Sequence, residues 1–307
     1  MKVHTFTRLC FPGHQFWNRD IDRSVKEELI TSLALRTNCT YDQVFATTLR
    51  SYEGVLFEKH NEKTTSNWIL PLGLFHRTWK NNGLMFCPHC FQKDGVSPYF
   101  RKLWRSSLSV VCLECKRYLL DHCPECKVPI SFFRNELGKK ENEPEGKLIL
   151  CFNCKLDFST INAIHADEDI VLIQKQIVDI IELGWKNTIY PFQFFDVLRV
   201  LLKILVGRRN TSVLVQKEIA ELLNIEIKAF AGGYANRFDT LSIEDRAYSL
   251  KMAFWLLDNW PDRFIEFFRS VEVYSSDLLR DVPNLPYWYW SVVYSNFYKS
   301  NVNRRFG

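Results

Sequence analysis

Eight of the ten cysteines in this sequence fall within one stretch, as four pairs whose members are separated by two residues. A pair at this spacing places both sulfurs on one side of a tight turn, and two such turns supply the four ligands of a tetrahedral zinc site. The spacing therefore predicts two bound zinc ions, with the ligands Cys87, Cys90, Cys112, Cys115, Cys123, Cys126, Cys151 and Cys154.

Other interpretations of paired cysteines fit less well. A disulfide framework needs an oxidising compartment, and residues 1 to 30 lack the apolar core of a signal peptide. A thioredoxin-like redox pair would explain one pair but not four. Buried thiols that fall at this spacing by chance are the remaining alternative. Cys10 and Cys39 stand outside the pairs and are expected to be small apolar residues.

The order in which the pairs combine is open to two arrangements. Sequential pairing joins the first pair to the second and the third to the fourth, whereas cross-bracing alternates them. We favour sequential pairing, because the segment 96–111 and the polar segment 135–146 can each return the chain as a short hairpin. His89 and His122 could each replace a thiolate, but with four sulfurs per site available they are interpreted as neighbouring residues.

Four sulfurs around each zinc leave no open position for water, so these metals should be structural. A structural zinc contributes about 10–16 kcal/mol of apparent binding free energy, which exceeds the stability of many small domains. The cysteine-rich segment should therefore collapse without metal.

Composition and charge describe a folded, mildly basic chain. Of its 307 residues, 47% are hydrophobic and 15% aromatic, and the formal net charge is +5. The apolar run 197–206 is interrupted by Arg199 and Lys203 before it reaches membrane-spanning length. We expect a soluble protein of a reducing cytoplasm.

The cysteine-rich segment is formally neutral once metal is counted, because the charges of eight thiolates and two zinc ions cancel its excess of basic side chains. It is therefore a poor candidate for a strong non-specific DNA clamp. Any contact with DNA there would depend on local placement, with the candidates Arg101, Lys102, Arg105, Lys116 and Arg117.

A helical hairpin is predicted before this segment. Apolar residues recur with helical spacing over 20–50, and a turn is expected at 37–39. Thr40 should cap the second helix, with Gln43 completing a capping box. This outline resembles a helix-turn-helix, in which DNA contact would fall to Tyr41, Gln43 and Thr47, although core packing or a protein interface fits the same pattern.

The residues around the first three cysteine pairs resemble the signature of the TniQ family, which includes the TnsD-type target selectors. The similarity lies in 86–90, in Pro98-Tyr99-Phe100-Arg101, in Trp104-Arg105 and in Cys123-Pro124-Glu125-Cys126. Family members commonly have histidine within a CPxH pattern where this chain has Cys115, a change that preserves metal binding because a thiolate is an equally good zinc ligand.

Further helices are predicted after the cysteines. Asp167 can cap a helix with an isoleucine stripe, Tyr190-Pro191 can start another that runs to Leu205, and a helix should run into the turn at Trp260-Pro261. A second helix-turn-helix outline spans 216–238, with Asn224 at its turn. Its candidate DNA contacts are Lys228, Tyr234, Asn236 and Arg237, against a structural hairpin as the alternative.

The predicted architecture is mainly α with small β zinc-ribbon elements. It comprises an N-terminal helical, helix-turn-helix-like domain at 1–82, a tandem zinc-binding module at 83–160 and a C-terminal helical domain at 161–307. In the tail, Tyr287-Trp288-Tyr289-Trp290 could stack on bases or bury in a partner, with core packing favoured.

The resemblance implies a non-enzymatic adaptor of a bacterial Tn7-like or CRISPR-associated DNA transposition system, located in the bacterial cytoplasm. Such a protein connects target DNA, or an RNA-guided complex, to an AAA+ regulator of the TnsC type and so indirectly to the transposase. A homodimer would suit that role. The alternative is a stand-alone, sequence-specific, zinc-containing DNA-binding regulator. An enzyme is disfavoured, because no paired carboxylates or phosphate-binding glycine loop accompany Asp121-His122.

Overall fold

The computed structural model describes residues 3–14, 16, 19–61, 64, 66–75, 78–135, 148–186, 189–230, 237–279 and 284–298. The chain divides into two compact units: unit 1 holds 1–53 and 59–174, and unit 2 holds 54–58 and 175–307. The mainly helical class with short strands is confirmed. None of the described helices combines the length and the apolar character needed to cross a membrane.

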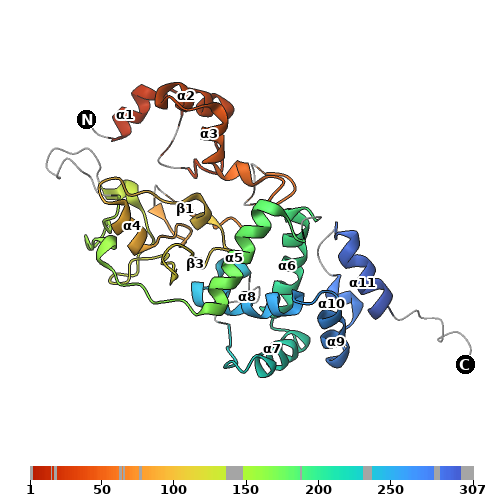
Figure 1. The fold of residues 1–307 in the computed structure, drawn as a ribbon. Coiled ribbons are helices and arrows are strands. Elements are labelled where there is room, and N and C mark those ends of the chain that lie inside the picture. Colours follow the sequence, from red (N-terminus) through yellow and green to blue (C-terminus); the bar gives the residue numbers. More distant parts are fainter. Residues whose placement is uncertain are drawn as a thin grey trace, which may run out of the picture. The chain divides into compact units, whose positions relative to one another are not determined.

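Unit 1 begins with a small helical subdomain (Figure 1). Its elements are α1 (Val3–Cys10), α2 (Glu27–Thr37), α3 (Tyr41–Ala46) and the 3-10 helix η1 (Leu49–Tyr52). The core of this subdomain is formed by Phe11, Val25, Leu29 and Ile30. The predicted three domains stay a prediction, but this subdomain and the cysteine-rich segment belong to the same compact unit.

The predicted turn between α2 and α3 is confirmed in detail. Asn38 ends α2 in the left-handed conformation, with φ of 55°. The Gln43 amide donates to Thr40 Oγ1 at 3.2 Å, and the Thr40 amide donates to Gln43 Oε1 at 2.9 Å, which completes the capping box. However, α3 has only 6 residues and buries none of them, so it is short for a helix that reads the major groove.

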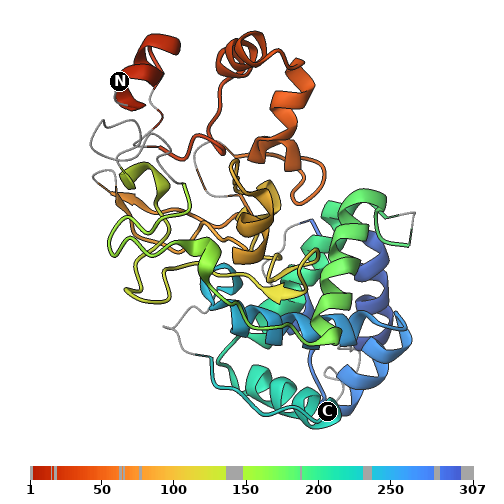
Figure 2. The ribbon, with the colours of Figure 1, turned by 60° about the vertical axis from the view of Figure 1, so that its left-hand side comes forward.

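The rest of unit 1 has little regular structure (Figure 2). Strands β1 (Leu74–Phe75) and β2 (Thr78–Trp79) pair antiparallel, as do β3 (Val111–Cys112) and β4 (Arg117–Tyr118). The helical elements are α4 (Pro88–Asp94) and the 3-10 helices η2 (Lys102–Arg105), η3 (Phe132–Asn135) and η4 (Phe158–Thr160). The expected hairpin over 96–111 is wrong, because this segment contains η2 and a loop and joins a strand only at Val111.

Aromatic side chains form the core of this part of unit 1. Phe86 stacks on Phe91 at 5.6 Å between ring centroids and meets Phe158 at 4.6 Å, while Phe91 meets Trp104 edge to face. At the start of α5 (Glu168–Leu183), buried Gln174 accepts hydrogen bonds at Oε1 from the amides of Val110 and Val111. A small core thus surrounds the loops that hold the cysteines.

Unit 2 is helical, with α6 (Pro191–Leu205) and α8 (Ile243–Leu257) packed together at its centre (Figure 1). The helices around them are α7 (Asn210–Leu222), α9 (Asp262–Ser270), α10 (Ser275–Leu278) and α11 (Tyr287–Phe297), with the 3-10 helix η5 (Phe238–Thr240) before α8. Pro191 occupies the first turn of α6, and Ser242 Oγ caps α8 by accepting from the Asp245 amide.

The predicted helices after the cysteines are confirmed, but the second helix-turn-helix is not found in the described residues. The isoleucine stripe of α5 buries Ile170, Ile177 and Ile180. Asn224 has a left-handed φ of 51°, as predicted for the turn after α7. Residues 225–230 then form an irregular segment, and the next helical elements described are η5 and α8. No recognition helix follows the turn within the described part.

The aromatic residues of the tail divide between core and surface. Trp288 packs against Trp185 at 4.7 Å and Trp260 at 5.2 Å, and Tyr289 is fully buried, with its hydroxyl donating to the Leu278 carbonyl. In contrast, Tyr287 is 77% exposed. Core packing therefore holds for only part of this segment.

Candidate metal centres

The structure gathers the eight paired cysteines into two clusters, in the sequential arrangement that we favoured. The first cluster is Cys87, Cys90, Cys112 and Cys115, and the second cluster is Cys123, Cys126, Cys151 and Cys154. Within each cluster all four sulfurs lie within 4.8 Å of one another. Typical separations are 3.4 Å between the sulfurs of Cys90 and Cys112 and 3.5 Å between those of Cys123 and Cys154.

These separations identify the chemistry of the clusters. A disulfide would bring two sulfurs to about 2.05 Å, and every cysteine here is a free thiol. Zinc–sulfur bonds of about 2.3 Å in a tetrahedron separate the sulfurs by roughly 3.8 Å. The sulfurs thus lie close to the spacing that a tetrahedral metal requires, so the residues fit two Zn²⁺ ions with four thiolates each.

Three of the four cysteine pairs lie in the same kind of turn. The amides of Lys116, Lys127 and Lys155, each directly after the second cysteine of a pair, donate to the carbonyl of the first at 2.7, 2.9 and 3.0 Å. All three lysines have positive φ, between 51° and 63°. The pair at Cys87 differs, because Pro88 starts α4 there and Cys90 lies in its first turn.

Backbone amides favour the charged form of the first cysteine in each pair. The amides of Glu114 and Cys115 donate to the Cys112 sulfur, and equivalent amides donate to Cys87, Cys123 and Cys151. Hydrogen bonds to a thiolate stabilise it, and a metal binds the thiolate. This arrangement suits metal ligands better than inert buried thiols.

Mutual hydrogen bonds and burial shift the pKa values of the clustered thiols. The pKa of Cys112 is held far below its ordinary value, because the Cys87 and Cys90 thiols donate to its sulfur. The same contact raises the pKa of Cys87 to about 12. Burial raises the pKa of Cys123 to about 12. Four sulfurs held this closely cannot all ionise without a cation between them.

The two clusters have different surroundings. In the first cluster three of the four cysteines, Cys87, Cys90 and Cys112, are at most 5% exposed. Phe86 and Phe91 flank this cluster's first cysteine pair in the sequence. In the second cluster Cys123 and Cys151 are buried, but Cys126 is only half-buried and Cys154 is exposed. The first cluster is therefore part of the core of unit 1, and the second lies at its surface.

The histidines near the clusters do not replace a sulfur. Each cluster is already complete with four cysteines, and these two clusters are the potential metal-binding groups found among the described residues. His122 Nδ1 contacts the carboxylate of Asp121 at 2.6 Å, next to the ligand Cys123. The Asp121–His122 pair thus borders the second cluster.

Two of the basic residues proposed for DNA contact, Arg105 and Lys102, bind the N-terminal helical subdomain of unit 1. Arg105 is 3% exposed and pairs with Asp20 at 2.6 Å and Asp22 at 3.4 Å. Lys102 donates to the Ala46 carbonyl at 2.7 Å and to Ser51 Oγ at 2.8 Å. Both residues therefore hold the N-terminal helical subdomain against η2.

Arg101 is engaged within the cysteine-rich segment itself. It pairs with both oxygens of Asp94, and its guanidinium lies over the rings of Tyr99 and Trp104 at 4.2 and 4.7 Å. A bidentate pair that also stacks on two rings fixes the side chain in place. This Tyr-Phe-Arg segment of the resemblance thus has a structural role.

The other proposed residues vary in accessibility. Lys116 and Lys228 are exposed. Arg117 donates to Asn162 Oδ1 at 2.9 Å and to the Ala163 carbonyl. Arg237 lies 4.0 Å from Asp239. Tyr234 and Asn236 are outside the described residues.

Two features of the centres were missed in the sequence. The lysine after three of the four cysteine pairs is a repeated Cys-x-x-Cys-Lys pattern, visible in the sequence once the shared turn is known. The pairing of Arg105 with Asp20 joins residues 85 positions apart. No local pattern signals such a contact.

Together, the fold and the two centres define a class of protein, namely a mainly helical chain built around tandem four-cysteine sites. A comparison with known families makes the assignment more specific. Residues 1–119 match the TniQ family, which confirms the resemblance over that part of the chain and identifies it as a TniQ domain. The matched region includes the first cluster and ends before the second. A TniQ domain indicates a transposition-associated protein of the Tn7-like type. No curated protein matches the chain.

Proposed function

We propose that this protein is a non-enzymatic target-selection adaptor of a Tn7-like transposition system, which binds two structural zinc ions and connects a target to a TnsC-type AAA+ regulator. The observation that supports this most directly is the TniQ match over 1–119. That match covers the helical subdomain and the first cluster, which share one compact unit.

The metal centres support a structural role for zinc. With four cysteines gathered per cluster, a bound Zn²⁺ would have a complete set of ligands and no position for a reacting water. The zinc ions would instead fix the loops that carry Lys102 and Arg105, and those two residues hold the N-terminal helices. The metals thereby shape a surface for recruiting other molecules.

Zinc content provides the first test. Purified chain should contain two zinc atoms, measured by elemental analysis against protein concentration. Removal of zinc with a chelator should weaken the near-UV circular dichroism signal of the aromatic side chains, because the aromatic core of unit 1 surrounds the first cluster. Fewer than two tightly bound zinc atoms would contradict the cofactor assignment.

The adaptor role is tested by binding to the regulator. The full chain, immobilised, should retain the TnsC-type ATPase encoded with it, in the presence of ATP, whereas a Cys90→Ser variant that has lost the first centre should not. A Lys217→Ala variant is a suitable control, because this lysine sits in an exposed pair on α7 of unit 2. Retention of specific DNA fragments without any ATPase binding would instead favour a stand-alone DNA-binding regulator.

The mode of targeting is tested by a gel shift with genomic fragments at about 150 mM salt, where weak non-specific binding fades. Sequence-specific retention would indicate direct reading of DNA, and its absence, together with co-purification of a CRISPR effector, would indicate docking on an RNA-guided complex. Among the proposed contacts, Lys116 and Lys228 are exposed and are the ones to replace with alanine. Each lost phosphate contact should reduce the salt dependence by about one unit of slope.

A further inference from the structure

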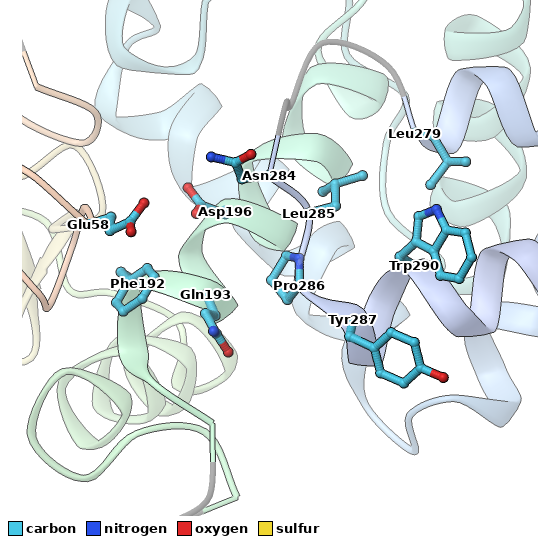
Figure 3. Close-up of a pocket in the computed structure, with 10 residues that line it drawn as sticks. All are labelled: Glu58, Phe192, Gln193, Asp196, Leu279, Asn284, Leu285, Pro286, Tyr287 and Trp290. Atoms are coloured by element: carbon cyan, nitrogen blue, oxygen red, sulfur yellow. The ribbon is translucent and has the colours of Figure 1, made fainter.

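Unit 2 contains an open pocket of about 740 Å³, which lies within the range of ligand sites, roughly 300–1,000 Å³. One side is formed by Phe192, Gln193 and Asp196, which lie on one face of α6 (Figure 3). The segment 284–290 forms the opposite side, and Glu58 faces Asp196 across the space (Figure 3). All of these residues belong to unit 2, and all except Glu58 lie outside residues 1–119, the region that matches the TniQ family.

The charged side chains that line this pocket are negative. Among the described residues that line it, Glu58 and Asp196 are carboxylates and none is basic. Burial raises the pKa of Asp196 to about 6, and Glu58 raises it further, while Arg199 opposes both. A raised pKa means that the carboxylate is poorly compensated by its own surroundings. A cation in the pocket would therefore gain from both groups.

Aromatic rings extend from the pocket along α11. Trp290 lines the pocket and stacks on Tyr294 at 4.7 Å, Tyr294 stacks on Tyr298 at 4.8 Å, and Tyr287 stacks on Trp290 at 6.2 Å. These four rings are 39% to 77% exposed. The inward side of α11 is already filled by Trp288 and Tyr289, so packing does not require the outer rings.

We propose that this pocket binds an arginine side chain presented by a basic segment of a partner protein. A guanidinium suits the carboxylate side of the pocket, because its planar donors pair with carboxylates and its face can stack on an aromatic ring. Figure 3 shows the ring of Phe192 on the same side as Glu58 and Asp196, with Tyr287 and Trp290 on the other side. Tyrosine, tryptophan and arginine are also the residues most enriched at protein-binding hot spots. The exposed ladder of α11 would receive the residues that flank the arginine.

Other occupants fit less well. The exposed rings could stack on nucleobases, but a phosphate backbone would then approach two uncompensated carboxylates. A small metal ion would use the carboxylates and leave the aromatic side of the pocket without a role. The proposal does not rest on the adaptor function, because its argument uses only the charge and the aromatic rings of the pocket, and all its lining residues except Glu58 follow the TniQ match.

Fluorine NMR of the full chain provides the test. The nine tryptophans are labelled with 5-fluorotryptophan, and the Trp290 signal is assigned by its loss in Trp290→Phe. The probe is arginine blocked at both ends, with blocked citrulline as its neutral isostere and blocked lysine as a second cation. Blocked arginine should shift the Trp290 signal in a saturable way, lysine less so and citrulline not at all.

Carboxylate variants link the shift to the pocket. Asp196→Asn should weaken the arginine-induced shift at least about fivefold, as expected when a charged hydrogen bond is lost. Glu266→Gln, an exposed carboxylate of α9, should leave it unchanged. The remaining tryptophan signals report whether each variant is folded, and Glu58→Gln repeats the test should Asp196→Asn disturb them.

The proposal is overturned if the Trp290 signal responds to citrulline as strongly as to arginine, or if it responds to no probe. A response to adenosine monophosphate or single-stranded DNA but not to arginine would show that the pocket binds nucleotides. A response to Mg²⁺ or Ca²⁺ alone would show that it binds a metal ion, and either result would also overturn the proposal. A failure here would leave retention of the TnsC-type ATPase unaffected, so the two hypotheses are tested separately.

Discussion

The two cysteine clusters share one kind of turn in three of their four cysteine pairs, yet the clusters lie in different environments. The first cluster lies in the core, where Cys87, Cys90 and Cys112 are at most 5% exposed and Phe86 and Phe91 stack beside them. The second lies at the surface, with Cys154 exposed. Turn geometry prepares a metal ligand, but packing decides how much of the fold depends on the metal.

The surface position of the second cluster does not isolate it from the core. Four residues after Cys154 the chain enters η4, where Phe158 packs against Phe86 at 4.6 Å between ring centroids. The Phe158 amide also donates to the Ile149 carbonyl at 2.8 Å, which joins the two sides of the last cysteine turn. The second centre thus positions Phe158, which packs in the aromatic core around the first centre.

The largest difference is expected between cysteine variants of the two clusters. Cys90→Ser should lose the first zinc and the cooperative unfolding of unit 1, since a structural zinc contributes about 10–16 kcal/mol of apparent binding free energy. Cys154→Ser should lose one zinc but keep a cooperative transition at a lower temperature. Elemental analysis and differential scanning calorimetry measure both. Equal losses would show that the clusters are energetically equivalent.

The ion pair beside the first cluster should produce the next largest effect. Arg105→Ala leaves the Asp20 carboxylate, whose side chain is only 10% exposed, without its partner, which should lower the free energy of unfolding by about 3–5 kcal/mol. Lys93→Ala is the matched control, because its pair with Glu114 has both side chains more than half exposed, so solvent screens it and its loss should barely change the free energy of unfolding. Denaturant titration followed by circular dichroism gives both values. If Arg105→Ala lowered the free energy of unfolding no more than Lys93→Ala does, the Arg105–Asp20 pair would not stabilise unit 1.

Phe158→Ala tests the link between the clusters. Removing a fully buried phenylalanine should lower the free energy of unfolding by about 3 kcal/mol through lost burial and a residual cavity. Because Phe158 follows the second cluster but packs in the core of the first, zinc release from the first cluster should also accelerate. Timed transfer of zinc to a coloured chelator measures this. Acceleration confined to the second zinc would argue against the link.

The smallest effect is expected at the lysines with positive φ. Lys116→Gly and Lys155→Gly place glycine where the left-handed conformation is already adopted, so each should raise the free energy of unfolding by about 0.5–1 kcal/mol over the corresponding alanine variant. The gain should be larger at Lys116, whose turn belongs to the buried cluster. Thermal unfolding of the four variants at saturating zinc measures the difference.

Local sequence patterns predicted much of the fold. Cysteine spacing predicted both clusters, because two residues between the members fix the turn regardless of the rest of the chain. The capping box at Thr40 and Gln43 and the left-handed turn at Asn224 were also predicted correctly, since each depends on backbone groups within a few residues. The hairpin over 96–111 was not, because the contacts that shape this segment come from elsewhere, such as the pairing of Ile69 with Ser106.

The roles of charged and aromatic side chains were beyond the sequence. In the sequence Arg105 and Lys116 are both simply cations, yet in the structure Arg105 is buried against Asp20 and Lys116 is exposed. Trp288 and Trp290 lie two positions apart, and one packs in the core while the other lines a pocket. Spacing determined which residues could bind metal, because ligand geometry is local. Only the tertiary structure decided which cations and rings remain accessible, because burial depends on residues distant in the chain.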